Sequence, residues 1–227
     1  MPTTNLSDLP HFQLPPSPVL RVGVTGGIGS GKSYVCRQLE AAGHRVFSCD
    51  EVAKRIIRTD PEVRHSLTPL VGPDVYDSDG RLVKPVLAAY LCRGRECSAR
   101  VDAIVHPRVA AAFLREAEEM AAALPADATA PQLAGGVGAD GRHVTVDTLG
   151  ALARGRVIYM ECALLFESHF DRLVDTSVLV HVSAATQLAR LMGRDRISEE
   201  KAREWLALQL SEDERMAHAA LVLDNEA

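Results

Sequence analysis

Several common signals are missing from this 227-residue chain. It has no run of about 18 apolar residues, so we expect no membrane-spanning segment. It has no excess of Lys and Arg, since its formal net charge is -5, and this does not fit a nucleic-acid binder. Residues 1–18 lack the basic start and apolar stretch of a secretory signal. We therefore expect neither a membrane nor a nucleic acid as partner.

Cysteine is also sparse, and its distribution fits neither a small disulfide-bonded domain nor a zinc finger. The five cysteines are odd in number, and no pair has the spacing of a zinc finger. The pattern favours a reducing compartment, and we expect the protein to be cytoplasmic. The cysteines are Cys36, Cys49, Cys92, Cys97 and Cys162.

Short apolar runs alternate with helical patterns along most of the chain. Strands separated by helices predict an α/β fold with a parallel sheet and helices on both faces. We interpret residues 1–18 as a loose Pro-rich arm and residues 19–227 as a single domain. The expected strands cover residues 19–25, 45–49, 157–160, 177–182 and 221–223, and the expected helices cover 32–42, 51–58, 86–91, 108–123, 186–193 and 198–209, with one more opened by Ser211 and Glu214.

Residues 124–153 differ from the rest in composition. They are rich in Ala, Gly, Pro, Asp and Thr and show little periodicity. We expect an exposed loop insertion that is dispensable for chemistry.

A phosphate-binding motif follows the first expected strand. Gly26-x4-Gly31-Lys32-Ser33 matches the P-loop pattern, with an apolar strand before it and a helix after it. Glycines let backbone N–H groups approach phosphate oxygens, Lys32 adds a mobile positive charge, and Ser33 offers a hydroxyl to Mg²⁺. We expect the Lys32 ammonium to face solvent before ATP binds. The expected ATP-binding residues are Gly27, Ile28, Gly29, Ser30, Gly31, Lys32, Ser33 and Tyr34.

A P-loop alone does not separate kinases from GTPase switches. The guanine-reading Asn-Lys-x-Asp pattern is missing from the sequence. Asp77-x-x-Gly80 matches a short switch motif, but it lies in a turn-rich stretch, and we interpret it as a surface turn. The motif therefore favours a kinase.

Charged residues outside the loop suggest further roles. Asp50 follows the second strand, where it can deprotonate an attacking hydroxyl, but it can equally cap the next helix. Arg190 and Arg194 share one face of a helix and suggest a lid over the triphosphate. The alternative for these arginines is a solvated face paired with Asp195 and Glu199.

Taken together, these residues resemble the dephospho-coenzyme A kinase family. The segments that carry the resemblance are Val24-Thr25-Gly26-Gly27-Ile28-Gly29-Ser30-Gly31-Lys32-Ser33, Asp50, His106-Pro107, Leu164-Leu165-Phe166-Glu167, Gln187 to Asp195, and Asp224-Asn225. The departures are Ser48 in place of an Asp, Tyr34 in place of a small residue, Ala163 in place of Pro, and the stretch 124–153. The family also continues beyond Asp-Asn with Gly and a helix, which leaves adenine packing open.

The resemblance implies a P-loop kinase three-layer fold with a helical acceptor lobe at about 60–120 and an arginine-bearing lid at about 187–200. It implies ATP- and Mg²⁺-dependent phosphorylation of the ribose 3′-hydroxyl of dephospho-coenzyme A, the final step of coenzyme A biosynthesis. The alternatives are a kinase of another small acceptor, such as a nucleoside monophosphate, and a non-catalytic nucleotide-binding paralogue. The implied catalytic residues are Asp50, Lys32, Arg190 and Arg194, the implied acceptor-binding residues are Thr25, Lys54 and His106, and Ser33 is the implied Mg²⁺ ligand.

Overall fold

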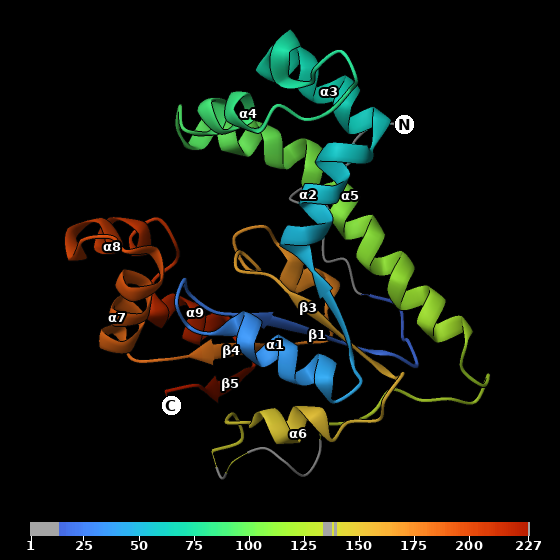
Figure 1. The fold of residues 1–227 in the computed structure, drawn as a ribbon. Coiled ribbons are helices and arrows are strands. Elements are labelled where there is room, and N and C mark those ends of the chain that lie inside the picture. Colours follow the sequence, from blue (N-terminus) through green and yellow to red (C-terminus); the bar gives the residue numbers. More distant parts are fainter. Residues whose placement is uncertain (1–13, 134–137, 139, 227) are drawn as a thin grey trace. The chain divides into compact units, whose positions relative to one another are not determined.

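The computed structural model describes residues 14–133, 138 and 140–226 (Figure 1). The described chain divides into two units. One runs from Cys49 to Leu114, and the other contains residues 14–48 and 115–226. Most of the expected N-terminal arm, residues 1–13, lies outside the described residues.

The larger unit is built around a parallel sheet. Its strands are β1 (Leu20–Thr25), β2 (Arg45–Ser48), β3 (Val157–Glu161), β4 (Thr176–His181) and β5 (Leu221–Asp224). They lie in the order β2-β3-β1-β4-β5, and every neighbouring pair is parallel. The predicted α/β class and the five predicted strands are confirmed. Because parallel strands all end at the same edge, the carboxyl end of the central strand β1 is flanked by those of β3 and β4.

Alternation along the strands creates one continuous apolar face. Val22 and Val24 of β1 point to the same side as Val157 and Tyr159 of β3, because side chains two apart share a face. Helix α1 (Lys32–Ala41) covers this face with Val35, Cys36 and Leu39. The opposite face is also buried, since a Cβ added at Gly23 would lie 2.8 Å from the Leu165 side chain.

Part of the stretch 124–153 belongs to this core, so the expectation of an exposed loop is wrong for its second half. Helix α6 (Val146–Gly150) packs beside α1 (Figure 1), and Leu149 is fully buried. The backbone of Val144 and Arg142 also bonds to both sides of Val222 on β5, at 2.8 and 2.9 Å. Composition concealed this role because so short a helix shows no full apolar period.

Three helices follow β4, each with a side-chain cap. They are α7 (Ala184–Asp195), α8 (Glu199–Leu206) and α9 (Glu212–His218). Ser183 caps α7, Ser198 caps α8, and Ser211 forms a capping box with Glu214. The predicted helices in this region are confirmed.

The smaller unit is helical. It contains α2 (Cys49–Thr59), α3 (Pro61–Val71), the 3-10 turn η2 (Pro73–Val75), α4 (Lys84–Leu91) and the first part of α5 (Arg95–Ala122). Helix α3 was not predicted, although Asp60 caps it and Pro61 occupies its first turn. Asp77 to Gly80 is a turn, as expected, closed by the Gly80 N–H on the Asp77 carbonyl at 2.9 Å.

Helix α5 begins earlier in the chain than predicted. Pro107 was predicted to start a helix, but α5 runs through it. Pro removes one intrahelical hydrogen bond. Val105 and Val109, which are buried on either side of it, retain their packing and hold the helix together.

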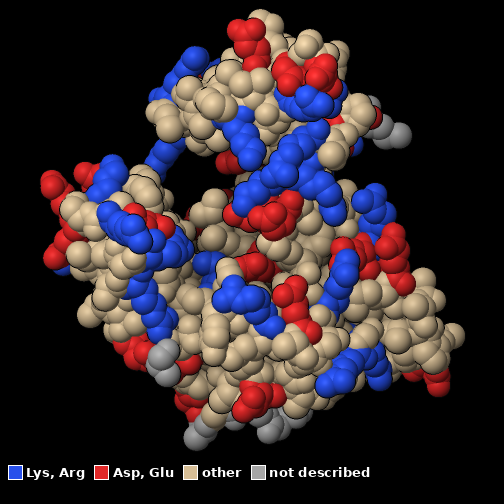
Figure 2. All heavy atoms as spheres, viewed as in Figure 1, with Lys and Arg blue, Asp and Glu red and all other residues tan. Residues whose placement is uncertain are grey.

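The surface is mixed in charge. On the face drawn in Figure 2, Lys and Arg are interspersed with Asp and Glu. Within the described residues, no helix is both long enough and apolar enough to span a membrane.

Leu149→Ala tests whether α6 contributes to the core. Leu149 is 0% exposed, so we expect the free energy of unfolding to fall by about 2–5 kcal/mol, through lost burial and a residual cavity. Leu208→Ala is the matched control, since Leu208 is 67% exposed and should change stability by no more than about 0.5 kcal/mol. Urea denaturation measures both. Equal stability of the two variants would show that α6 is a loosely attached loop.

Candidate nucleotide site

The P-loop turns sharply between β1 and α1, and Gly27 is needed for its packing. A Cβ added at Gly27 would lie 2.1 Å from Gln187 Nε2 and 2.8 Å from Arg215 Nη2. Gly31, just before α1, has φ 90°, a conformation that favours glycine. The loop can therefore lie against α7 and α9 only because its backbone lacks side chains at these points.

Lys32, at the start of α1, does not face solvent as expected. Its Nζ donates to the Gly26 carbonyl at 2.7 Å and lies 3.4 Å from that of Gly27. Burial lowers the pKa of Lys32, while the nearby Glu161 carboxylate raises it and the Arg215 guanidinium lowers it further. The ammonium therefore bonds to carbonyl groups of the loop itself.

Glu161 contacts the P-loop serine, whereas its sequence position had suggested it only as an alternative to Asp50 as the catalytic base. It ends β3 and pairs in register with Val24 of β1. The Ser33 hydroxyl donates to Glu161 Oε1 at 2.7 Å. The available signal was its position, since an acid at the carboxyl end of a buried strand next to β1 lies near the P-loop.

The two arginines predicted to belong to a lid have different surroundings. Arg190 Nη2 donates to the Asn225 carbonyl at 2.9 Å, and Asn225 Nδ2 donates to the Ser30 carbonyl at 2.8 Å. Arg190 is thus linked to the loop through the residue after β5. Arg194 pairs with its neighbour Asp195 at 2.7 Å and is 61% exposed at its side chain. Its geometry agrees with the alternative of a solvated ion pair.

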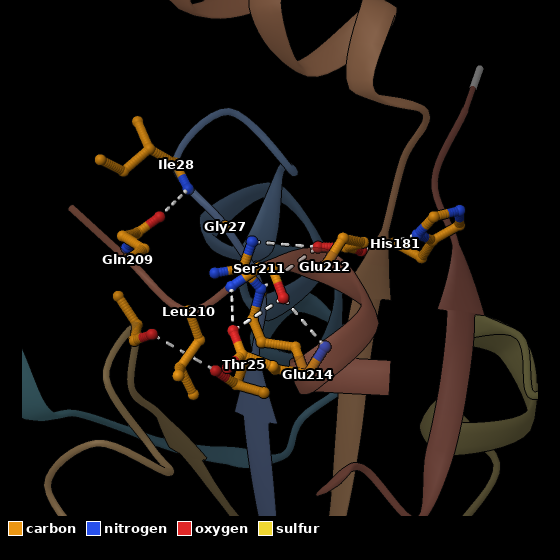
Figure 3. A network of polar contacts seen from close by, with 12 residues as sticks. Thr25, Gly27, Ile28, His181, Gln209, Leu210, Ser211, Glu212 and Glu214 are labelled. Carbon is orange, nitrogen blue, oxygen red and sulfur yellow. Dashed lines mark hydrogen bonds and ion pairs between the residues drawn. The ribbon is translucent and has the colours of Figure 1, made fainter. Parts of the chain in front are cut away.

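Two further contacts hold the linker between α8 and α9 near the loop (Figure 3). The Ile28 N–H donates to Gln209 Oε1 at 2.9 Å. The Leu210 N–H donates to Glu167 Oε1 at 3.3 Å. No sequence signal pointed to Gln209, because the contact joins residues 181 positions apart.

A buried arginine lies beneath the loop. Arg215 of α9 is 3% exposed, and its Nη2 is 3.0 Å from Glu212 Oε2. Glu212 Oε1 also lies 2.7 Å from Nδ1 of His181, at the end of β4 (Figure 3). Glu212 thus partners the buried charge of Arg215 and connects α9 to the end of β4.

The remaining predicted nucleotide and acceptor residues of this unit lie on either side of the loop. Thr25 ends β1, is fully buried, and its hydroxyl lies 3.5 Å from the Ala163 carbonyl. Tyr34, in the first turn of α1, is 51% exposed. Their assigned roles remain predictions.

The other predicted residues belong to the smaller unit. Asp50 lies inside the first turn of α2, which begins at Cys49, so the capping alternative does not fit its position. Its carboxylate is 89% exposed and lies 3.8 Å from Lys54 Nζ, which also pairs with Glu51 at 2.9 Å. His106 of α5 lies 3.5 Å from Asp102, and burial lowers its pKa.

The side-chain oxygens beside the P-loop can be compared with the ligands that Mg²⁺ requires. Among the described residues, no cluster of three or more His, Cys, Asp or Glu could form a metal cage. Mg²⁺ in phosphoryl-transfer sites needs only one or two protein oxygens beside phosphate and water. Ser33 Oγ and the Glu161 carboxylate, 2.7 Å apart, fit that requirement.

Comparison with known proteins identifies close similarity over nearly the whole chain. A family model described as Dephospho-CoA kinase matches residues 20–130 and 142–227. The expectation that all of 124–153 lacks a family counterpart is therefore wrong, since only 131–141 interrupts the match. The dephospho-CoA kinase of Bacteroides fragilis is 32% identical over 207 residues, covering 91% of this chain and 85% of that protein. That of Salinibacter ruber is 33% identical over 205 residues, covering 90% and 88%.

Solved structures agree on the fold. A crystal structure of a Thermus thermophilus protein superposes with a TM-score of 0.66 at 25% identity, covering 92% of this chain and 90% of that one. The dephospho-CoA kinase from Campylobacter jejuni has a TM-score of 0.51 at 17% identity, covering 92% and 89%.

Gly27→Ala tests the close packing under the loop. The new methyl group would displace Gln187 and the buried Arg215, so we expect a loss of about 1–3 kcal/mol of stability and weaker nucleotide binding. Gly193→Ala, in α7, is the control, because no atom lies within 4 Å of its added Cβ. Ala should stabilise that helix by about 0.5–1 kcal/mol. Urea denaturation and ADP titration measure the effects, and a Gly27→Ala variant that behaves like Gly193→Ala would contradict the packing argument.

Proposed function

The chain belongs to the dephospho-CoA kinase family, and from this premise we propose how its own residues carry out the reaction. It is an ATP-dependent kinase that phosphorylates dephospho-coenzyme A. We propose the ribose 3′-hydroxyl as the acceptor atom. The observation that supports the nucleotide assignment best is the complete P-loop at the carboxyl end of β1, with Lys32 and Ser33 in place.

The loop is proposed to bind the triphosphate through its backbone N–H groups and Lys32. On binding, Lys32 would exchange the carbonyls of Gly26 and Gly27 for phosphate oxygens. That exchange replaces neutral acceptors with charged ones, which form stronger hydrogen bonds. It would also compensate the buried ammonium, whose pKa is otherwise lowered by burial.

Ser33 and Glu161 are proposed to hold Mg²⁺ beside the phosphates. The ion would supply positive charge that offsets the charge of the phosphate groups. Glu161 would accept hydrogen bonds from the metal's water or coordinate it directly, while Ser33 supplies a hydroxyl oxygen. Their existing hydrogen bond keeps both oxygens at one edge of the loop.

Asp50 is proposed as the base that accepts the acceptor's proton. Its exposed carboxylate is available to a ligand, and Lys54 Nζ lies 3.8 Å from it. Arg190 and Arg194 are proposed to stabilise the transferring group, which requires Arg194 to exchange Asp195 for phosphate. We also propose that Thr25, Lys54 and His106 contact the acceptor and that residues of about 60–120 form the acceptor lobe.

A cytoplasmic location is proposed as well. All five cysteines are free thiols, and three of them are buried. Burial raises the pKa of Cys36 to about 12, so this thiol stays protonated and unreactive. Free thiols of this kind suit a reducing compartment.

Asp50→Asn tests the proposed base. Asn keeps the shape of the side chain but cannot accept a proton, so turnover should fall by roughly 10²–10⁴-fold. The melting temperature should change little because the side chain is 89% exposed. Glu51→Gln is the matched control, since Glu51 also pairs with Lys54 but has no assigned role. Steady-state turnover is measured with ATP, Mg²⁺ and either dephospho-coenzyme A or nucleoside monophosphates.

These measurements test the assignment of the base and the assignment of the acceptor separately. Normal turnover of Asp50→Asn would exclude Asp50 as base and direct attention to Glu161 and Glu167. Faster turnover of a nucleoside monophosphate by the unmodified protein would instead overturn the acceptor assignment.

Glu161→Gln tests the proposed Mg²⁺ site. Gln can still accept the Ser33 hydrogen bond but lacks the negative charge, so the apparent Mg²⁺ affinity should fall by roughly 10- to 100-fold. Glu118→Gln, at an exposed position of α5, should leave it unchanged. Turnover is titrated with MgCl₂ at fixed ATP. Identical Mg²⁺ dependence in the two variants would remove Glu161 from the metal site.

A further inference from the structure

The linker between α8 and α9 brings a neutral acceptor to the P-loop. The Ile28 N–H points at the side-chain amide of Gln209, 2.9 Å away (Figure 3). Since a backbone nitrogen can only donate, the amide atom facing it must be the oxygen. Gln209 therefore satisfies one of the loop N–H groups in this structure.

That N–H is one of the groups on which a P-loop depends. Such loops bind phosphates by directing successive backbone N–H groups at the phosphate oxygens. An N–H carries one proton and cannot make a full hydrogen bond to both Gln209 and a phosphate. A charged phosphate oxygen is the stronger acceptor, so it should displace the amide.

We propose that Gln209 determines nucleotide affinity by competing with phosphate for the Ile28 N–H. The inference rests on the proposed function for the assignment of this loop to ATP. Gln209 is thus a positioning residue that bonds to the Ile28 N–H and is released when the triphosphate binds.

Gln209 could also favour phosphate binding, by holding the P-loop in its binding conformation. The other contacts of the P-loop decide whether this effect or the competition with phosphate is larger. The Ser30 N–H donates to the Gly27 carbonyl at 3.1 Å, and Asn225 donates to the Ser30 carbonyl at 2.8 Å. Gln187 and Arg215 pack directly against Gly27. Because these contacts hold the loop without Gln209, its competition with phosphate is the larger effect.

Release of Gln209 should move the residues before it in the chain more than those after it. On its C-terminal side, Ser211 is held by its capping box and α9 is anchored by buried Arg215. On its N-terminal side, Leu208 is exposed and the linker leads into α8. The displacement should therefore be taken up by the linker and α8, while α9 stays in place.

The test measures phosphate binding without catalysis. Calorimetric titration of the full chain with ADP and with tripolyphosphate is carried out for Gln209→Met, Gln209→Glu and the control Leu208→Ala. Tripolyphosphate reports on the phosphate site alone, because it carries neither base nor ribose. Thermal melting of each variant establishes that it is folded.

The two substitutions have opposite expected effects. Met removes the competing oxygen, so both ligands should bind about two- to tenfold more tightly, the range of one hydrogen bond. Glu adds a negative charge that bonds Ile28 more strongly and repels phosphate, so binding should weaken by at least about tenfold. Leu208→Ala should stay within about twofold.

Weaker or unchanged ligand binding by folded Gln209→Met would overturn the inference. Weaker binding would indicate that Gln209 is itself a phosphate ligand. If Met destabilises the protein, Gln209→Asn gives the same test, because its shorter side chain withdraws the oxygen from Ile28. Normal tripolyphosphate binding by the unmodified chain, without kinase turnover, would overturn the proposed function and leave this inference standing. Failure of the unmodified chain to bind tripolyphosphate would overturn both.

Discussion

The site depends on the close approach of backbone and side chains under the P-loop. Gly27 has no Cβ, and this leaves room for Gln187 of α7 and Arg215 of α9 to lie against the chain. Those two helices could not pack there around a larger residue. The turn after β1, the proposed phosphate site, thus also determines how the C-terminal helices α7 and α9 pack against it.

This packing brings charged groups together. Burial lowers the pKa of Lys32, the nearby Glu161 carboxylate opposes this shift, and the Arg215 guanidinium, itself paired with Glu212, lowers the pKa of Lys32 further. Interactions between charges are stronger at such a site than in water. A bound triphosphate would supply the negative charge that Lys32 lacks, so its binding and the stability of the loop should increase together.

In this structure the proposed binding groups are paired within the protein. Lys32 bonds to loop carbonyls, Arg190 to Asn225, and Arg194 to Asp195. The Ile28 N–H bonds to Gln209 in the same way. Under the proposed function, each of these contacts would be exchanged for a contact with the nucleotide. Nucleotide affinity would then be a difference between two sets of hydrogen bonds.

Local patterns in the sequence were sufficient for the strands, the P-loop and the cap of α9, because apolar alternation, glycine spacing and Ser-x-x-Glu act over a few residues. Other features needed the tertiary structure. The burial of α6 and the continuation of α5 through Pro107 depend on the packing around them. The hydrogen bonds of Ser33 with Glu161 and of Ile28 with Gln209 join residues that are distant in the chain. No local pattern records which distant group satisfies a donor, so these partners were decided only when the sheet and its helices packed together.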